Sequence, residues 1–292
     1  MKAVKTCRSS LYLTAAFLLL FLNGSFTFSH AGDVVVTLDR SDRDRVDCAT
    51  TEDPVEQSYI LTAVPGAIAT LVLFPGGAGK LDVADWRLSI NAANFLVRSR
   101  HLFASFGFNV AVMDAATDFL SCPFGLRGRR LSEAHVSDIQ AVIQDLRGQY
   151  SGLQVWVVGT SRGTISAAQA AAELPAESGG PDGLVLTSSV TRSGSPPSNL
   201  ICEVALETIT VPTLIVTHKQ DECPVTPPED TKAIKDRLIS APRVHTRYFS
   251  GGFDPLSPPC EALSYHGYFG IEPRVVGRIA KWIEKQIKEY AE

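Results

Sequence analysis

Apolar residues gather in short runs along most of the chain, and longer segments with helical spacing lie between these runs. The run that begins at Ala69 is almost continuous, which is typical of a strand buried on both faces of a sheet. The predicted strands are residues 33–38, 58–64, 69–77, 108–114, 155–159, 182–189, 213–222 and 243–251.

The predicted helices are residues 90–107, 132–150, 164–174 and 272–292. Ser132 is a suitable N-cap for the second of them. Strands and helices that alternate in this way predict an α/β fold, with a mainly parallel sheet of about eight strands flanked by helices. The segment between the strands 182–189 and 213–222 is rich in Ser and Pro. It is too short for a large cap domain.

Composition agrees with a globular protein. The chain has 292 residues, of which 45% are hydrophobic and 20% charged. The net charge is −4 and no basic stripe is visible, so neither a nucleic acid nor an anionic membrane is indicated as a partner. The length alone allows one large domain or two small ones, and it leaves the oligomeric state open.

The N-terminus has the pattern of an export signal. Basic residues precede an apolar stretch at 11–22, and small residues lead up to Ala31. We expect residues 1–31 to be a signal peptide cleaved after Ala31. The remainder, 32–292, is then a secreted or periplasmic domain that no longer contacts a membrane. The alternative is an anchor that is retained.

Five cysteines would remain after cleavage, so at least one is free or pairs with another chain. They are Cys48, Cys122, Cys202, Cys223 and Cys260. An oxidising compartment allows the others to form disulfides. Their spacing fits neither a zinc site nor a redox motif, so no metal is predicted.

The clearest chemical signal is Gly159-Thr160-Ser161-Arg162-Gly163, a G-x-S-x-G motif between a predicted strand and a predicted helix. A nucleophile elbow needs this context, because the turn is sharp and flanking side chains would clash. By itself the pentapeptide also fits any tight turn. The strand before it and the helix after it favour Ser161 as a nucleophile.

A nucleophilic serine requires a base, and the base requires an acid that orients it. His266 lies in a loop just before the last helix and is the best candidate for the base. His218 follows a strand at the position expected for the acid, and His245 lies within a strand, where a structural role is more common.

Asp221 is the best candidate for the acid, because it follows a strand and lies between Ser161 and His266 in sequence. Glu222 and Asp254 are its rivals. Asp114 also ends a strand, but it precedes the serine.

Cysteines flank the candidate acid and base. Cys223 comes two residues after Asp221, and Cys260 comes six residues before His266. If the acid and the base meet at one site, a disulfide between these cysteines is geometrically reasonable. Cys48 and Cys122 are a second candidate pair.

An oxyanion hole needs two backbone N–H donors directed at one point. Arg162, directly after the nucleophile, is expected to supply one, and Gly77 or Ala78 in the glycine-rich loop after Phe74 the other. The sequence does not choose between these two. The same loop lacks the residues that a phosphate-binding loop needs at positions 74 and 81, so nucleotide binding is rejected.

With these motifs in order, the chain from Asp33 onward resembles the α/β-hydrolase superfamily, especially small lid-poor serine hydrolases of the dienelactone-hydrolase-like and esterase-like kind. One departure is Phe74-Pro75, which stands where that superfamily usually has a histidine before the oxyanion glycines. The resemblance implies that Ser161 attacks a carbonyl carbon, that His266 takes its proton, and that Asp221 holds the imidazole. It implies no cofactor.

The predicted function is therefore that of an exported serine hydrolase acting on a small-molecule carboxylic ester. The alternatives are a serine peptidase or amidase with the same triad, and a non-catalytic relative that only binds a ligand. The side chain of Arg162 either favours an anionic substrate or pairs with a nearby carboxylate. The pairing is the expected arrangement.

Overall fold

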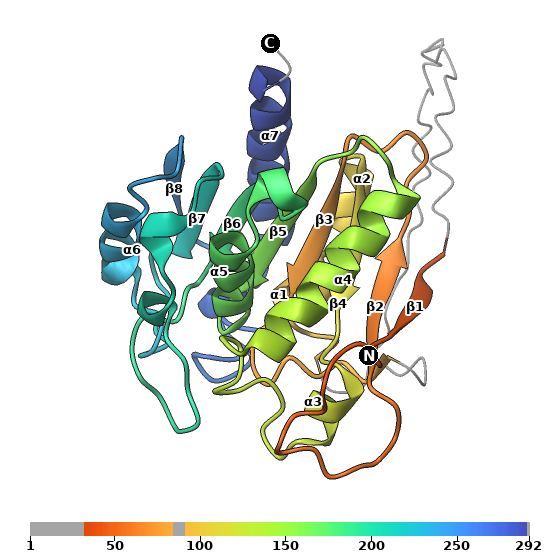
Figure 1. Ribbon diagram of the computed structural model, residues 1–292. Coiled ribbons are helices and arrows are strands. Elements are labelled where there is room, and N and C mark those ends of the chain that lie inside the picture. Colours follow the sequence, from red (N-terminus) through yellow and green to blue (C-terminus); the bar gives the residue numbers. More distant parts are fainter. Residues whose placement is uncertain (1–31, 84–90, 291–292) are drawn as a thin grey trace, which may run out of the picture.

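The computed structural model describes residues 32–83 and 91–290, which form an α/β structure around one eight-stranded sheet (Figure 1). The order across the sheet is β1-β2-β4-β3-β5-β6-β7-β8. The strands are β1 (Val34–Asp39), β2 (Glu56–Thr62), β3 (Ala69–Phe74), β4 (Phe108–Met113), β5 (Val155–Thr160), β6 (Gly183–Thr187), β7 (Thr213–His218) and β8 (Val244–Phe249). Pairing is antiparallel for β1–β2 and β2–β4 and parallel from β4 to β8. The predicted mostly parallel sheet is confirmed.

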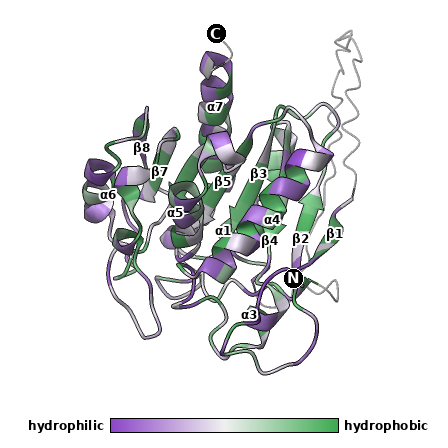
Figure 2. Cartoon of the chain, in the orientation of Figure 1, coloured by the Kyte–Doolittle hydropathy of each residue, from purple (hydrophilic) through white to green (hydrophobic). Residues whose placement is uncertain are grey.

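Helices cover both faces of the sheet, and each face has its own apolar core. The helices are α1 (Phe95–Arg98), α2 (Arg100–Ser105), α3 (Thr117–Ser121), α4 (Glu133–Gln149), α5 (Gly163–Glu173), α6 (Thr231–Arg237) and α7 (Glu272–Tyr290). Helices α4 and α5 contribute to one core, and α1, α2 and α7 contribute to the other. In Figure 2 the central strands are hydrophobic and the hydrophilic residues lie on helices and loops. The central strands are buried on both faces, which explains their continuous apolar runs.

The prediction of one continuous helix over 90–107 is wrong. Its described part contains α1 and α2, which are separated at Ser99. Phe95 from α1 and Phe103 from α2 both enter the same core. A turn at Ser99 lets both short helices place apolar side chains there, and this packing outweighs the local helical pattern.

The connection from β6 to β7, residues 188–212, contains only the short 3-10 helices η3 (Ile201–Glu203) and η4 (Leu206–Thr208). Within the described residues it therefore forms no cap domain. None of the helices in the described part of the chain is both long and apolar enough to span a membrane. The predicted signal peptide, residues 1–31, lies outside the described residues.

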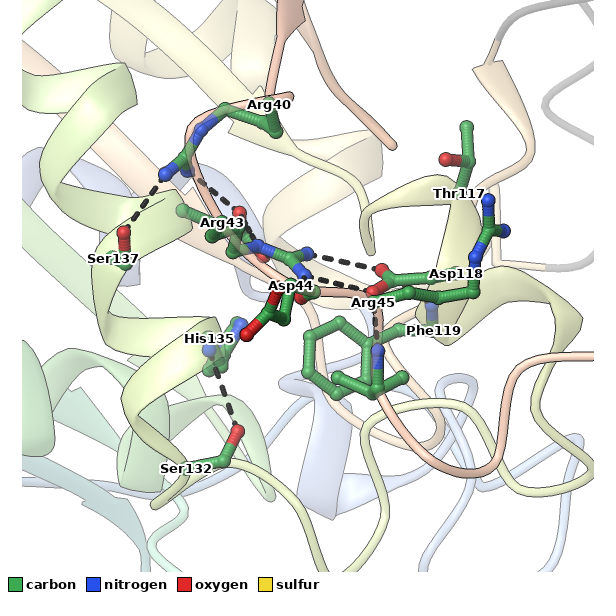
Figure 3. Close-up of polar contacts among 12 residues, drawn as sticks. Arg40, Arg43, Asp44, Arg45, Thr117, Asp118, Phe119, Ser132, His135 and Ser137 are labelled. Atoms are coloured by element: carbon green, nitrogen blue, oxygen red, sulfur yellow. Dashed lines mark hydrogen bonds and ion pairs between the residues drawn. The ribbon is translucent and has the colours of Figure 1, made fainter. Parts of the chain in front are cut away.

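The segment that follows β1 is held to the helical layer by buried ion pairs (Figure 3). Arg43 donates two hydrogen bonds to Asp118 and two to Asp138, at 2.8 to 3.0 Å. Arg40 donates to Asp138 at 2.6 Å. We call Arg40, Arg43, Asp118 and Asp138 the paired cluster. The disulfide Cys48–Cys122, one of the two predicted from the sequence, joins the same segment to the end of α3.

Candidate active site

Ser161 lies in the turn between β5 and α5, with the backbone that a nucleophile elbow requires. Its φ is 53°, in the left-handed region that is unfavourable for a serine. The flanking glycines make the turn possible. A Cβ on Gly159 would lie 2.4 Å from the carbonyl oxygen of Gly163, and one on Gly163 would lie 2.0 Å from that of Phe74. Side chains are excluded at both positions, so the two glycines of the motif are required for the sharp turn.

The loops after β7 and β8 bring Asp221 and His266 together. Nδ1 of His266 lies 2.9 Å from Oδ2 of Asp221, and both side chains are buried. Asp221 also accepts hydrogen bonds from the backbone N–H of Cys223 at 3.0 Å and from the hydroxyl of Thr226 at 2.9 Å. An ionised carboxylate can only accept, so Nδ1 carries the ring proton and Nε2 is left as the acceptor. This is the tautomer that a general base needs.

Three residues that the sequence analysis missed form hydrogen bonds around the histidine, and two of them, Thr226 and Ser188, contact it directly. The hydroxyl of Thr226 bridges the acid and the base, lying 3.1 Å from Nδ1 of His266. The hydroxyl of Ser188 donates to the carbonyl oxygen of His266 at 3.0 Å, and the phenol of Tyr268 donates to that of Val216 at 3.1 Å. No motif marks these residues. Only the convergence of β6, β7 and the last loop reveals them.

The disulfide Cys223–Cys260, also predicted from the sequence, ties the loop of the acid to the loop of the base. The two Cα atoms are 4.6 Å apart. Cys223 follows Asp221 closely, and Cys260 begins the segment that leads to His266. A covalent bond at this place limits the relative movement of the two loops. Cys202 is the free cysteine and is exposed.

The glycine-rich loop after β3 packs directly against Ser161. A Cβ on Gly76 would lie 2.9 Å from the Cβ of Ser161. Within the described residues, the backbone N–H groups of Gly77, Ala78 and Arg162 donate no hydrogen bond to another protein group. Arg162 and either Gly77 or Ala78 are the donors predicted for the oxyanion hole, and all three N–H groups remain available to a ligand.

The far end of this loop is anchored by Asp114, which sequence order had excluded as the acid. Its carboxylate accepts hydrogen bonds from the N–H groups of Leu81 at 2.7 Å, Val83 at 3.0 Å and Ala115 at 2.7 Å. Burial raises the pKa of Asp114 to about 6, against the lowering effect of these hydrogen bonds. Asp114 therefore has a structural role beside the site.

The other candidates for base and acid lie elsewhere. His218 is buried, stacks on Tyr265, and its Nε2 lies 2.8 Å from the carbonyl oxygen of Gly251. His245 accepts a hydrogen bond from the indole of Trp282 at 2.7 Å, in agreement with the structural role expected for it. Glu222 and Asp254 are exposed, and neither contacts His266 among the described residues.

Ser161 and His266 line one cavity of about 580 Å³ at the carboxyl ends of the parallel strands. Gly77, Ala78 and Arg162 line it as well. Another cavity, of about 490 Å³, lies near the amino ends of β5 and β7 and contains none of the candidate residues. In the part of the chain that the structure describes, no group of three or more His, Cys, Asp or Glu side chains is arranged to hold a metal ion.

Three arginines stand around the cavity without carboxylate partners among the described residues. Arg162 donates to the hydroxyl of Ser198 at 3.1 Å, and Arg127 donates to the carbonyl oxygen of Ser195 at 2.8 Å. The expectation that Arg162 pairs with a carboxylate is therefore wrong. Its guanidinium lies over the loop 194–198, where hydroxyl and carbonyl oxygens are the acceptors.

Arg130 is fully buried behind the glycine-rich loop. It donates to the carbonyl oxygens of Pro75 at 3.0 Å and Gly77 at 3.4 Å, and to the hydroxyl of Ser166 at 2.7 Å. We call Arg127, Arg130 and Arg162 the unpaired cluster. The sequence analysis missed Arg127 and Arg130, which lie in an arginine-rich turn that could have drawn attention to them.

Comparison with known proteins identifies the fold. No protein-family model matches the chain, and no curated protein matches its sequence. The structure is similar to an α/β-hydrolase of Saccharomyces cerevisiae peroxisomes, with a TM-score of 0.59 and 12% identity, covering 89% of this chain and 90% of that one. A thermostable carboxyl esterase from Bacillus coagulans gives a TM-score of 0.58 and 13% identity, covering 88% and 99%.

A dienelactone hydrolase from Anabaena variabilis is also similar, with a TM-score of 0.53 and 17% identity, covering 83% of this chain and 96% of that one. At such identities the likeness concerns the fold. The chain has the α/β-hydrolase fold, as the motifs led us to expect. The chemistry must be argued from its own residues.

Proposed function

We propose that the protein is an exported serine hydrolase that cleaves carboxylic esters of small molecules. The observation that carries the proposal is the hydrogen-bonded pair Asp221–His266 at the cavity that Ser161 enters from a strained turn. A buried carboxylate that fixes an imidazole tautomer at a cavity that a serine also lines supports a catalytic triad. A protein that only binds a ligand would not need it.

In the proposed mechanism Oγ of Ser161 attacks the ester carbonyl carbon while Nε2 of His266 accepts the hydroxyl proton. The carbonyl oxygen becomes an oxyanion and receives hydrogen bonds from the N–H of Arg162 and of Gly77 or Ala78. His266 then protonates the leaving alcohol. A water molecule, deprotonated by the same nitrogen, hydrolyses the acyl-enzyme, and Asp221 stabilises the imidazolium in both steps.

Two further observations support the proposal. The proteins that share the fold include esterases, such as the one from Bacillus coagulans. Their presence supports an ester rather than an amide as the substrate of this protein. Two disulfides fit an oxidising compartment, in agreement with export directed by residues 1–31 and cleavage after Ala31.

The proposal is tested with a fluorophosphonate probe and a short p-nitrophenyl ester. We expect the wild-type protein to be labelled and to release p-nitrophenol. We expect the Ser161→Ala protein to lose labelling, and its turnover to fall by roughly 10⁶-fold. Absence of labelling and of turnover in wild-type protein with a native circular dichroism spectrum would refute the proposal.

The acid is tested in the same assay with a matched pair of variants. Asp221→Asn should lower turnover by roughly 10³- to 10⁴-fold, because the amide no longer holds the correct imidazole tautomer. Asp254→Asn serves as the control, since Asp254 is exposed and should be neutral. The reverse result would assign the acid to Asp254.

A further inference from the structure

The proposed mechanism leaves two features of the cavity without a role, namely the guanidinium groups of Arg127 and Arg162. Both residues line the same cavity as Ser161 and His266. Their hydrogen-bond acceptors are neutral oxygens from Ser195 and Ser198. In addition, Nε of Arg127 is buried and has no hydrogen-bond partner among the described residues. A guanidinium usually satisfies its donors, so Arg127 has hydrogen-bonding capacity that the described residues leave unused.

These arginines also repel one another. Burial and the charge of Arg127 hold the pKa of Arg162 below its usual value. Burial and the charge of Arg162 lower the pKa of Arg130 to about 9. Positive charges that are brought together without a counter-ion cost free energy, and a bound anion would remove that cost. Arginines that lie close together with only neutral oxygens as acceptors are suited to binding an anion.

Among the described residues, the carboxylates at or behind the cavity lie on the side of the histidine. Glu261 lines the cavity in the segment that leads to His266, and it is exposed. Asp221 is engaged by His266 and Thr226. Neither carboxylate forms an ion pair with Arg127 or Arg162 among the described residues. The described lining of the cavity therefore combines two arginines that have no carboxylate partner with the candidate nucleophile and the candidate base.

We propose that the cavity accepts an ester that also carries an anionic oxygen group, a carboxylate or a phosphate, and that Arg127 and Arg162 bind this group. The inference rests on the proposed function, since Ser161 must act on the ester bond while the anion is held at the arginines. A guanidinium presents its donors in a planar fork that matches both kinds of anion. The group would be bound by charge-assisted hydrogen bonds from the two guanidinium groups.

The test compares two chromogenic esters that differ only in charge: mono-p-nitrophenyl adipate and its neutral methyl ester, each corrected for spontaneous hydrolysis. We expect wild-type kcat/KM to favour the anionic ester by about 10- to 100-fold, which is the range for hydrogen bonds to charged groups. Arg127→Gln should remove most of this preference, because kcat/KM should fall much more for the anionic ester than for the neutral one. Arg278→Gln, on the exposed face of α7, makes the same change in net charge and should retain the preference.

A wild-type preference for the neutral ester, or an equal loss on both esters in Arg127→Gln, would overturn the inference. A second arm is independent of turnover: the melting temperature of the Ser161→Ala protein with adipate or with inorganic phosphate. Stabilisation that disappears on adding Arg127→Gln supports the site, and the more effective anion identifies the group that it prefers. No stabilisation by either anion refutes the site. Absent labelling of Ser161 refutes the proposed function separately.

Discussion

The two groups of arginines in this molecule differ in what surrounds them. In the paired cluster, Arg40 and Arg43 meet the carboxylates of Asp118 and Asp138, which are fully buried. In the unpaired cluster, Arg127, Arg130 and Arg162 donate hydrogen bonds to carbonyl and hydroxyl oxygens, and Arg127 also lies over the ring of Phe124. Arginines whose charge is neutralised can hold one segment to another. Arginines whose charge is left over keep the capacity to bind an anion, at a cost in stability.

His135 lies between the two clusters. Nε2 of His135 is 2.8 Å from the hydroxyl of Ser166, which also accepts a hydrogen bond from Arg130. The serine hydroxyl can therefore donate its own hydrogen to Nε2. Burial, then the charges of Arg130 and Arg43, lower the pKa of His135 to about 3. The imidazole is therefore neutral, and it adds no further positive charge between Arg43 and Arg130.

The largest expected effect on stability comes from breaking the paired cluster. Arg43→Met leaves Asp118 short of its partner and Asp138 with Arg40 alone, and the cost of a broken buried pair is about 3–5 kcal/mol of unfolding free energy. Urea denaturation followed by circular dichroism measures this. Arg192→Met is the control, because Arg192 is half-exposed beside Asp230, and such pairs contribute about 1 kcal/mol or less. Equal losses in the two variants would contradict the comparison.

The unpaired cluster should respond in activity rather than in stability. Arg130→Met removes the hydrogen bonds to the carbonyl oxygens of Pro75 and Gly77, so the candidate oxyanion donors lose their support. We expect kcat for a neutral ester to fall by about 10²-fold with little change in KM, since a small misplacement costs that much. Unfolding free energy should change by less than about 2 kcal/mol, because removing a buried charge offsets the lost hydrogen bonds. A stability loss as large as that of Arg43→Met, with kcat retained, would show that Arg130 only supports the fold.

The smallest effect at neutral pH concerns the histidine between the clusters. Because the pKa of His135 is lowered on folding, the unfolded chain binds more protons below about pH 6.5. Stability should therefore fall as the pH drops from about 6.5 toward 3, by up to about 1.4 kcal/mol per pH unit from this residue. His135→Gln should flatten that part of the profile, as measured by urea denaturation at several pH values. An unchanged slope would contradict the assignment.

Much of the site could be anticipated because its signals are local. The strand, the turn with its two glycines and the helix that position Ser161 are contiguous, so their pattern is visible in the sequence. The order of Ser161, Asp221 and His266 follows the order of the strands. The cysteine pairs were visible too, because Cys223 and Cys260 stand close in sequence to residues expected to meet.

Other parts of the site could not be predicted, because they depend on contacts between distant segments. Thr226 reaches His266 from a different loop, and Ser188 supports that histidine from the end of β6. The break at Ser99 lies between two short helices that both place apolar side chains in one core, and no local pattern marks it. The acceptor of Arg162 is on a loop whose path no periodicity describes.

The sequence by itself determined the alternating strands and helices, the strained turn around Ser161, and a short list of partners for it. These follow from hydrophobic periodicity and from the steric needs of glycine, which act over a few residues. Only the tertiary structure decided that Asp221 rather than Glu222 or Asp254 contacts His266, and that Arg127, Arg130 and Arg162 remain without carboxylates. Such choices depend on which loops meet at one edge of the sheet, and that is set by the packing of the whole chain.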